Sequence, residues 1–124
     1  MEALILEKTE DTPGIVLDPA NGNFKITDRS LPENANGFYA PIFEWLDKYI
    51  ENPDSKVEFV FSLEYFNTAS AKQIAKVLLL LEKLSKKTKV LIIWRYKAED
   101  TDMQSSGVRY SKLLDVEFEL QEVK

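Results

Sequence analysis

Apolar and polar residues alternate in several short stretches of the chain, which is the pattern of strands that bury one face. The clearest stretch is 57–63, where every second residue is Val, Phe or Leu. Earlier in the chain, residues 3–6, 15–17 and 23–27 are apolar or alternating and are separated by Glu-Asp-Thr-Pro-Gly and Asp-Pro-Ala-Asn-Gly. Proline and glycine at these positions are typical of turns. The first third of the chain is therefore predicted to be an antiparallel meander.

Helical spacing replaces alternation in three further stretches. Apolar residues recur every three or four positions in 38–50, with Pro41 placed near a first turn and Asn-Pro-Asp at 52–54 ending the helix. A second helix is predicted from Thr68 to about residue 86, because its core stripe follows the same spacing: Ala71, Ile74, Val77, Leu78, Leu81 and Leu84. Leu79 and Leu80 widen this stripe, which predicts burial under a neighbouring helix or, alternatively, a partner-binding patch.

The last third of the chain predicts strand, helix and strand. Residues 89–96 are apolar at almost every position, as in a strand covered on both faces. Together with strand 57–63 and the helix between them, this predicts a right-handed βαβ crossover with parallel strands. A third helix is predicted in 99–114, with Met103, Gly107, Tyr110 and Leu114 inside, and an alternating last strand in 116–123.

Taken together, these elements predict an α/β fold in one domain, residues 1–124. The domain is expected to contain a mixed sheet of about six strands, about three helices and a central parallel βαβ unit. The polar stretch 28–35 contains Pro32, which cannot donate to a strand ladder, and is therefore predicted to be a loop at a sheet edge.

Composition excludes several classes of function. The chain has 124 residues, no cysteine and no histidine, so thiolate chemistry and the usual general base and metal ligand are absent. The net charge of −5 argues against a nucleic-acid surface, and no stretch resembles a signal peptide or a membrane span. We therefore expect a cytoplasmic protein that binds neither nucleic acid nor membrane, is not an enzyme and uses no cofactor or metal.

Thr68 opens the second predicted helix and has the chemistry of an N-cap, because its hydroxyl can accept from a free backbone N–H. A phosphate there would meet the positive end of the helix dipole, although position alone favours a simple cap. Two alternative functions would use the same helix N-terminus. One is binding of a nucleotide or small anion at the helix N-terminus, assisted by Arg29, and the other is a nucleophile pair of Thr68 with Lys72.

Three stretches carry a resemblance to a known family. They are Arg-Ser-Leu-Pro-Glu-Asn-Ala at 29–35 with the following Phe-x-x-Pro-Ile-Phe-Glu-Trp-Leu, Glu-Tyr-Phe-Asn-Thr-Ala-Ser-Ala-Lys at 64–72, and Val-Leu-Ile-Ile-Trp-Arg-Tyr at 90–96 before acidic residues. The order of elements resembles the STAS domain of anti-sigma-factor antagonists. The three stretches resemble, more specifically, the SiaC family of bacterial regulatory phosphoproteins, over nearly the whole chain.

The resemblance implies a signalling switch. In that family the threonine of the Tyr-Phe-Asn-Thr segment is phosphorylated by a dedicated Ser/Thr kinase and dephosphorylated by a PP2C-like phosphatase. The unphosphorylated form binds and activates a diguanylate cyclase, which links the family to c-di-GMP and biofilm signalling. By this resemblance Thr68 is the phospho-acceptor. This sequence has Ala69 where serine is expected in many relatives.

Two segments are expected to contact the partner. The loop following the third predicted strand should lie at the same sheet edge as Thr68, because it leads into a helix that packs on that sheet. The residues expected to contribute are Arg29, Glu33, Asn34, Asn67, Ser70 and Lys72. For the loop, the alternative is that polar side chains such as Asn34 only hold the backbone before the helix.

Overall fold

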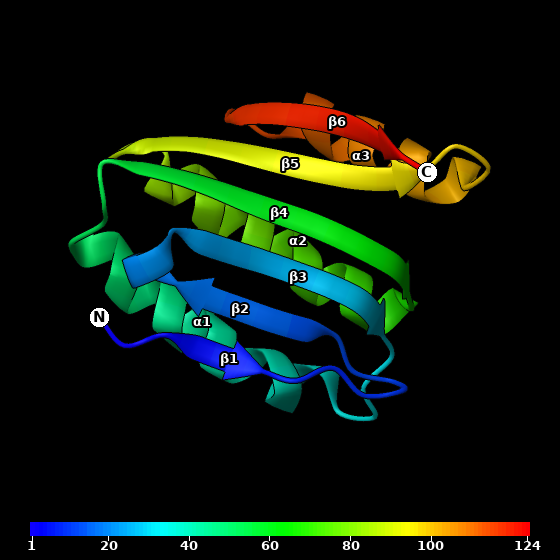
Figure 1. Ribbon diagram of the computed structural model, residues 1–124, viewed down its shortest axis with the longest axis horizontal. Helices are drawn as coiled ribbons and strands as arrows, with labels where there is room; N and C mark the ends of the chain where they lie inside the picture. Colours follow the sequence, from blue (N-terminus) through cyan, green and yellow to red (C-terminus); the bar gives the residue numbers. More distant parts are fainter.

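A single mixed sheet of six strands organises the computed structural model, which describes residues 1–124 (Figure 1). The strands are β1 (Leu4–Leu6), β2 (Gly14–Asp18), β3 (Asn23–Ser30), β4 (Lys56–Phe66), β5 (Lys89–Lys97) and β6 (Glu117–Val123). The helices are α1 (Ala35–Glu51), α2 (Thr68–Leu84) and α3 (Thr101–Leu113), and a short 3₁₀ turn, η1 (Pro19–Asn21), joins β2 to β3.

The strands lie in the sheet in the same order as in the sequence. β1, β2 and β3 pair antiparallel, which confirms the predicted meander. From β3 onward every pair is parallel, and each crossover contains one helix: α1, α2 and then α3. The α/β fold, the mixed sheet and the central parallel βαβ unit are therefore as predicted.

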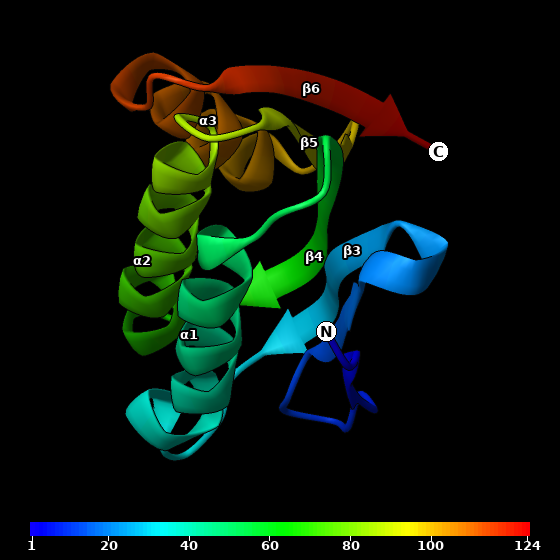
Figure 2. The same ribbon diagram turned by 90° about the vertical axis from the view of Figure 1, so that its left-hand side faces the viewer.

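All three helices cover the same face of the sheet (Figure 2). The core lies between this face and the helices, with Phe59, Phe61 and Trp94 at its centre. The prediction that β5 is covered on both faces is wrong, because no helix packs on the other side. On that side Ile93 is buried beside Val60 of β4, with which it pairs, while Leu91 and Arg95 are half-buried.

Two boundaries differ from the prediction. β3 continues to Ser30 through an irregularity at Asp28, whose φ is 74°, so only residues 31–34 form the expected loop. α1 begins at Ala35, and Pro41 consequently lies in its second turn instead of its first. A proline here removes one internal hydrogen bond of the helix. The packing of Tyr39, Ile42 and Trp45 into the core outweighs that loss.

The second helix buries most of its predicted stripe. Ile74, Val77, Leu78, Leu81 and Leu84 are buried, whereas Ala71 is only half-buried and Ser70 and Gln73 complete the inner face. Leu80 packs against the core, but Leu79 is 56% exposed and has no neighbouring helix over it. The prediction of burial is therefore wrong for Leu79. None of the three helices combines the length and apolar character that a membrane crossing requires.

Candidate functional site

Thr68 is the first residue of α2 and does not cap it. β4 ends at Phe66, and only Asn67 separates the strand from the helix. The Asn67 side chain accepts a hydrogen bond from the Ser70 N–H at 2.9 Å, so Asn67 is the N-cap and the predicted cap at Thr68 is wrong. Asparagine is among the best capping residues, and here it precedes the threonine by one position. The hydroxyl of Thr68 is consequently left exposed and makes no hydrogen bond within the chain.

A buried chain of hydroxyl groups anchors the start of α2. The Ser30 Oγ at the end of β3 lies 2.8 Å from the Tyr39 hydroxyl of α1 and donates to the Ser70 Oγ of α2 at 2.8 Å. Since the single proton of Ser30 goes to Ser70, Tyr39 donates to Ser30. Burial raises the pKa of Tyr39 to about 12, so this donor stays protonated at neutral pH. The Asn67 N–H also donates to the Ser30 carbonyl at 3.2 Å.

The burial of Ser70 corrects one expectation. Its side chain has no exposed area, so it belongs to the interior and does not form part of a partner-contact surface. Gln73, one turn further, is also buried and donates to the Asn36 side chain of α1 at 2.7 Å. The first two turns of α2 are thus held to β3 and α1 on the inside and are free on the outside.

Lys72 lies on the outside, one helical turn after Thr68. It is exposed and makes neither a hydrogen bond nor an ion pair. A lysine that activates a nucleophile must be desolvated, and nothing in the structure desolvates this one. The pair of Thr68 and Lys72 therefore lacks the setting that catalysis would need. The anion-binding hypothesis also loses one donor, because Asn67 occupies the Ser70 N–H.

The loop before α1 lies where it was predicted, at the same end of the sheet as Thr68, beside the carboxyl ends of the parallel strands β3 and β4. Arg29 pairs with Tyr65 and Ser30 with Phe66, so the ends of β3 and β4 are neighbours. Asn34 accepts from the Gly37 N–H at 3.0 Å and caps α1, which gives it the structural role that was the alternative. Glu33 is exposed and has no partner within the chain.

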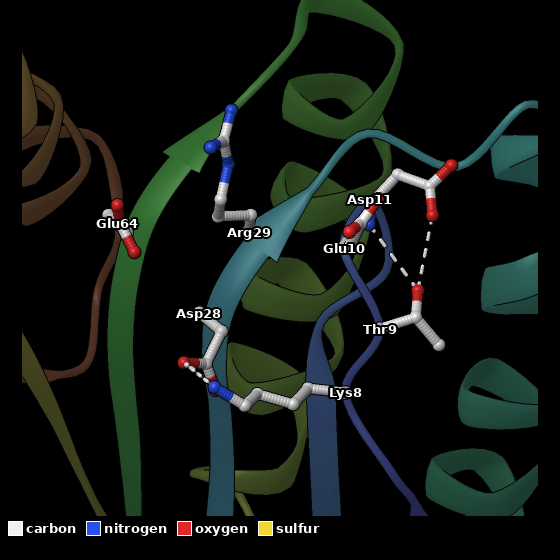
Figure 3. A pocket seen from close by; sticks show the side chains of 7 residues that line it. All are labelled: Lys8, Thr9, Glu10, Asp11, Asp28, Arg29 and Glu64. Carbon is white, nitrogen blue, oxygen red and sulfur yellow. Dashed lines mark hydrogen bonds and ion pairs between the residues drawn. The ribbon is translucent and has the colours of Figure 1, made fainter.

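No sequence pattern indicated the open polar cleft that lies beside the carboxyl ends of β3 and β4 (Figure 3). Its volume is about 650 Å³, and Arg29 and Glu64 line it from β3 and β4. Its other lining residues are Lys8, Thr9, Glu10, Asp11 and Asp28. Lys8 and Asp28 form an ion pair at 3.5 Å, and in the figure Arg29 extends toward the end of β4. No group of His, Cys, Asp or Glu side chains here or elsewhere is arranged to hold a metal ion.

The model of a family described as SiaC family regulatory phosphoprotein matches residues 6–123. This chain belongs to the SiaC family. It is 28% identical to an uncharacterised protein of Pseudomonas aeruginosa over 97 residues, which are 77% of each chain.

Two solved structures have the same fold. SiaC of Pseudomonas aeruginosa superposes with a TM-score of 0.88 and 23% identity, covering 99% of this chain and 100% of that one. The second is SiaC of the same organism in complex with the diguanylate cyclase SiaD, of which SiaC is the activator. Its TM-score is 0.89 at 23% identity, with 97% of this chain and 99% of that one covered. The predicted SiaC-type α/β fold is thereby confirmed.

Proposed function

We propose that this SiaC family member is a signalling switch whose Thr68 is reversibly phosphorylated. The observation that carries the proposal is the position of Thr68. Thr68 is the first residue of α2, and its hydroxyl is exposed and makes no hydrogen bond within the chain, because Asn67 caps the helix. A kinase can therefore reach the hydroxyl without opening the helix. The phosphate would then lie beside free backbone N–H groups at the positive end of the helix dipole.

Several of the other hydroxyl groups in the chain are less suitable acceptors. Ser30 and Ser70 are fully buried, and a kinase could reach them only if the end of β3 and the start of α2 unfolded. Thr9 and Thr12 bond to each other at 2.6 Å within their own turn. Thr101 is exposed at a helix start like Thr68, but carboxylates surround it. Accessibility and local charge together favour Thr68.

The unphosphorylated form is the one that binds and activates a partner in this proposal, and the partner is a diguanylate cyclase. SiaC of Pseudomonas aeruginosa has been solved as the activator in complex with such a cyclase, SiaD. A phosphate adds a charge of about −1.5 to −2 at the first residue of α2, where Asn67 and Thr68 contribute only a neutral amide and a hydroxyl. A partner surface that fits the neutral helix start would then be repelled and would have to desolvate the phosphate.

A Ser/Thr kinase and a PP2C-like phosphatase would act on Thr68 in this scheme, and the chain itself would catalyse nothing. The setting would be the bacterial cytoplasm, and the output c-di-GMP and the biofilm behaviour that it controls. Of the contacts predicted from the sequence, we retain Arg29, Glu33, Asn34, Asn67 and Lys72 as residues near the partner. Arg29 and Ser30 pair with the end of β4, which supports placing this loop beside the switch.

Binding to the diguanylate cyclases of the source organism, purified one at a time, tests the proposal. At least one of these cyclases should bind the unphosphorylated (bare) protein and the Thr68→Ala variant equally well. Enzymatically phosphorylated protein should bind it at least thirtyfold more weakly, and Thr68→Asp should be weakened in the same direction. Thr101→Asp is the matched control and should bind like wild type. Equal binding of the bare and phosphorylated forms, or no binding by the bare form, would refute the switch.

A further inference from the structure

The outer surface of α2 carries one continuous stripe that begins at Thr68. Lys72, Lys76, Leu79 and Lys83 follow at intervals of four, four, three and four residues. At about 100° per residue these five side chains lie within about 80° of the helix circumference, and the stripe is about 22 Å long. All five are exposed, and Leu79 is 56% exposed. The buried residues Val77 and Leu81 lie on the opposite side of the helix.

The positive charges of this stripe are not neutralised within the chain. The protein has a net charge of −5 and 21 acidic residues, yet its ion pairs use Lys8, Lys56 and Lys86. None of the three stripe lysines pairs with a carboxylate. Lys76 is placed over the ring of Phe43 on α1, with its ammonium nitrogen 5.8 Å from the ring centre. An acidic protein thus presents an unpaired basic stripe with one exposed leucine in it.

We propose that this lysine stripe, residues Lys72, Lys76, Leu79 and Lys83, is the docking surface for an acidic segment of the cyclase partner. The inference deepens the proposed function and rests on it. Complementary charge brings two proteins together and sets the register between them. A single exposed leucine between the lysines calls for one apolar side chain on the partner, flanked by carboxylates. The stripe is continuous with Thr68, so one segment would contact both.

The stripe also explains why phosphorylation would release the partner instead of strengthening binding. A phosphate on Thr68 would lie one turn from Lys72, at the spacing at which opposite charges on a helix attract. It would neutralise the first cation of the stripe and repel the carboxylates of an acidic segment. A partner with a basic surface would be drawn closer by the same phosphate. Whether phosphorylation weakens or strengthens partner binding therefore follows from the charge of the docking surface.

Charge and apolar variants of α2, matched with variants of α3, test the stripe. Lys76→Glu, Lys83→Ala and Leu79→Ala are made in the full-length bare protein. Lys112→Glu and Leu113→Ala are the controls, because Lys112 is exposed and unpaired and Leu113 is 71% exposed near the end of α3. Affinity is measured for the cyclase that binds the bare wild type. Lys76→Glu and Leu79→Ala should each weaken binding about tenfold or more, and the controls less than threefold.

Salt dependence and alternative ligands complete the test. Wild-type affinity should fall as salt rises from 50 to about 300 mM, and Lys76→Glu should flatten that dependence. If the cyclase binds the bare protein while the α2 variants bind like wild type, the stripe is refuted and the switch stands. If no cyclase binds the bare protein, both are refuted. Binding of phosphatidylglycerol vesicles or duplex DNA that Lys76→Glu abolishes would instead assign the stripe to a lipid or a nucleic acid. Circular dichroism verifies that each variant is folded.

Discussion

The starts of α2 and α3 are built from the same local parts. Each helix follows a parallel strand, and each has a threonine as its first residue, Thr68 or Thr101. Each is capped by the residue before it. The side chain of Asn67 accepts from the Ser70 N–H at 2.9 Å, and that of Asp100 accepts from the Met103 N–H at 3.0 Å. Both threonines are exposed. The capping pattern alone therefore does not distinguish them.

Charge distinguishes them. The first turn of α2 has no acidic residue, its cap is a neutral amide, and Lys72 follows one turn later. At α3 the cap is the carboxylate of Asp100, Asp102 lies in the first turn, and Glu99 precedes both. A phosphate on Thr101 would meet carboxylates that already interact with the helix dipole. A helix N-terminus favours an added phosphate where no nearby carboxylate already compensates the positive end of the helix dipole.

Anchoring also differs between the two starts. At α2 the residue that donates to the cap is Ser70, whose hydroxyl is part of the buried chain through Ser30 to Tyr39. At α3 the corresponding residue is Met103, whose carbonyl accepts from the Trp94 indole N–H at 3.0 Å. The start of α2 is therefore connected to β3 and α1 by hydroxyl groups, and the start of α3 to β5 by an aromatic side chain.

The largest expected difference between the two threonines is in phosphate incorporation. When the purified chain is incubated with the proposed kinase of the source cell, Thr68→Ala should reduce incorporation to background, because it removes the acceptor. Thr101→Ala should leave incorporation at the wild-type level. Intact-protein mass spectrometry after incubation with ATP measures both. Appreciable phosphate on Thr68→Ala would mean that charge does not select the site as we argue.

A smaller effect is expected from the buried hydroxyls. Ser30→Ala leaves the Tyr39 and Ser70 hydroxyls without their shared partner and should lower the free energy of unfolding by about 1–3 kcal/mol. Ser106→Ala is the matched control, because Ser106 is a half-buried serine of α3 without a hydrogen bond, and it should change the value by less than about 0.5 kcal/mol. Urea unfolding measures both. Equal losses would show that the buried hydroxyl chain stabilises the start of α2 no more than a serine without a hydrogen bond does.

The smallest effect concerns the dipole itself. Phosphorylation of Thr68 should raise the free energy of unfolding by about 0.3–1 kcal/mol, because the charge lies at the helix N-terminus. Asn67→Asp preserves the cap but adds the carboxylate that α3 has, so the gain from phosphorylation should largely disappear. Thermal unfolding of the bare and phosphorylated forms of both proteins measures the difference. If phosphorylation stabilises Asn67→Asp as much as wild type, charge does not distinguish the two helix starts.

The periodicity of the sequence determined the type and order of nearly all elements. Alternation in 57–63 and helical spacing in 68–84 each reflect which side of an element must be buried, and that requirement is local. The turn signals before β2 and β3 gave the antiparallel meander for the same reason. The Tyr-Phe-Asn-Thr segment carries the family resemblance that implies phosphorylation of Thr68, and the family match over residues 6–123 confirms the membership.

Only the tertiary structure decided which side chains remain available at the site. Asn67 and Thr68 are adjacent and both can cap a helix, and the path of the chain out of β4 assigns the cap to Asn67. Ser70 and Leu79 illustrate the same limit in opposite directions. The serine is buried because β3 and α1 supply hydroxyl partners, and the leucine is exposed because no element covers that side of α2. Burial depends on elements far apart in sequence, so neighbouring residues alone do not determine it.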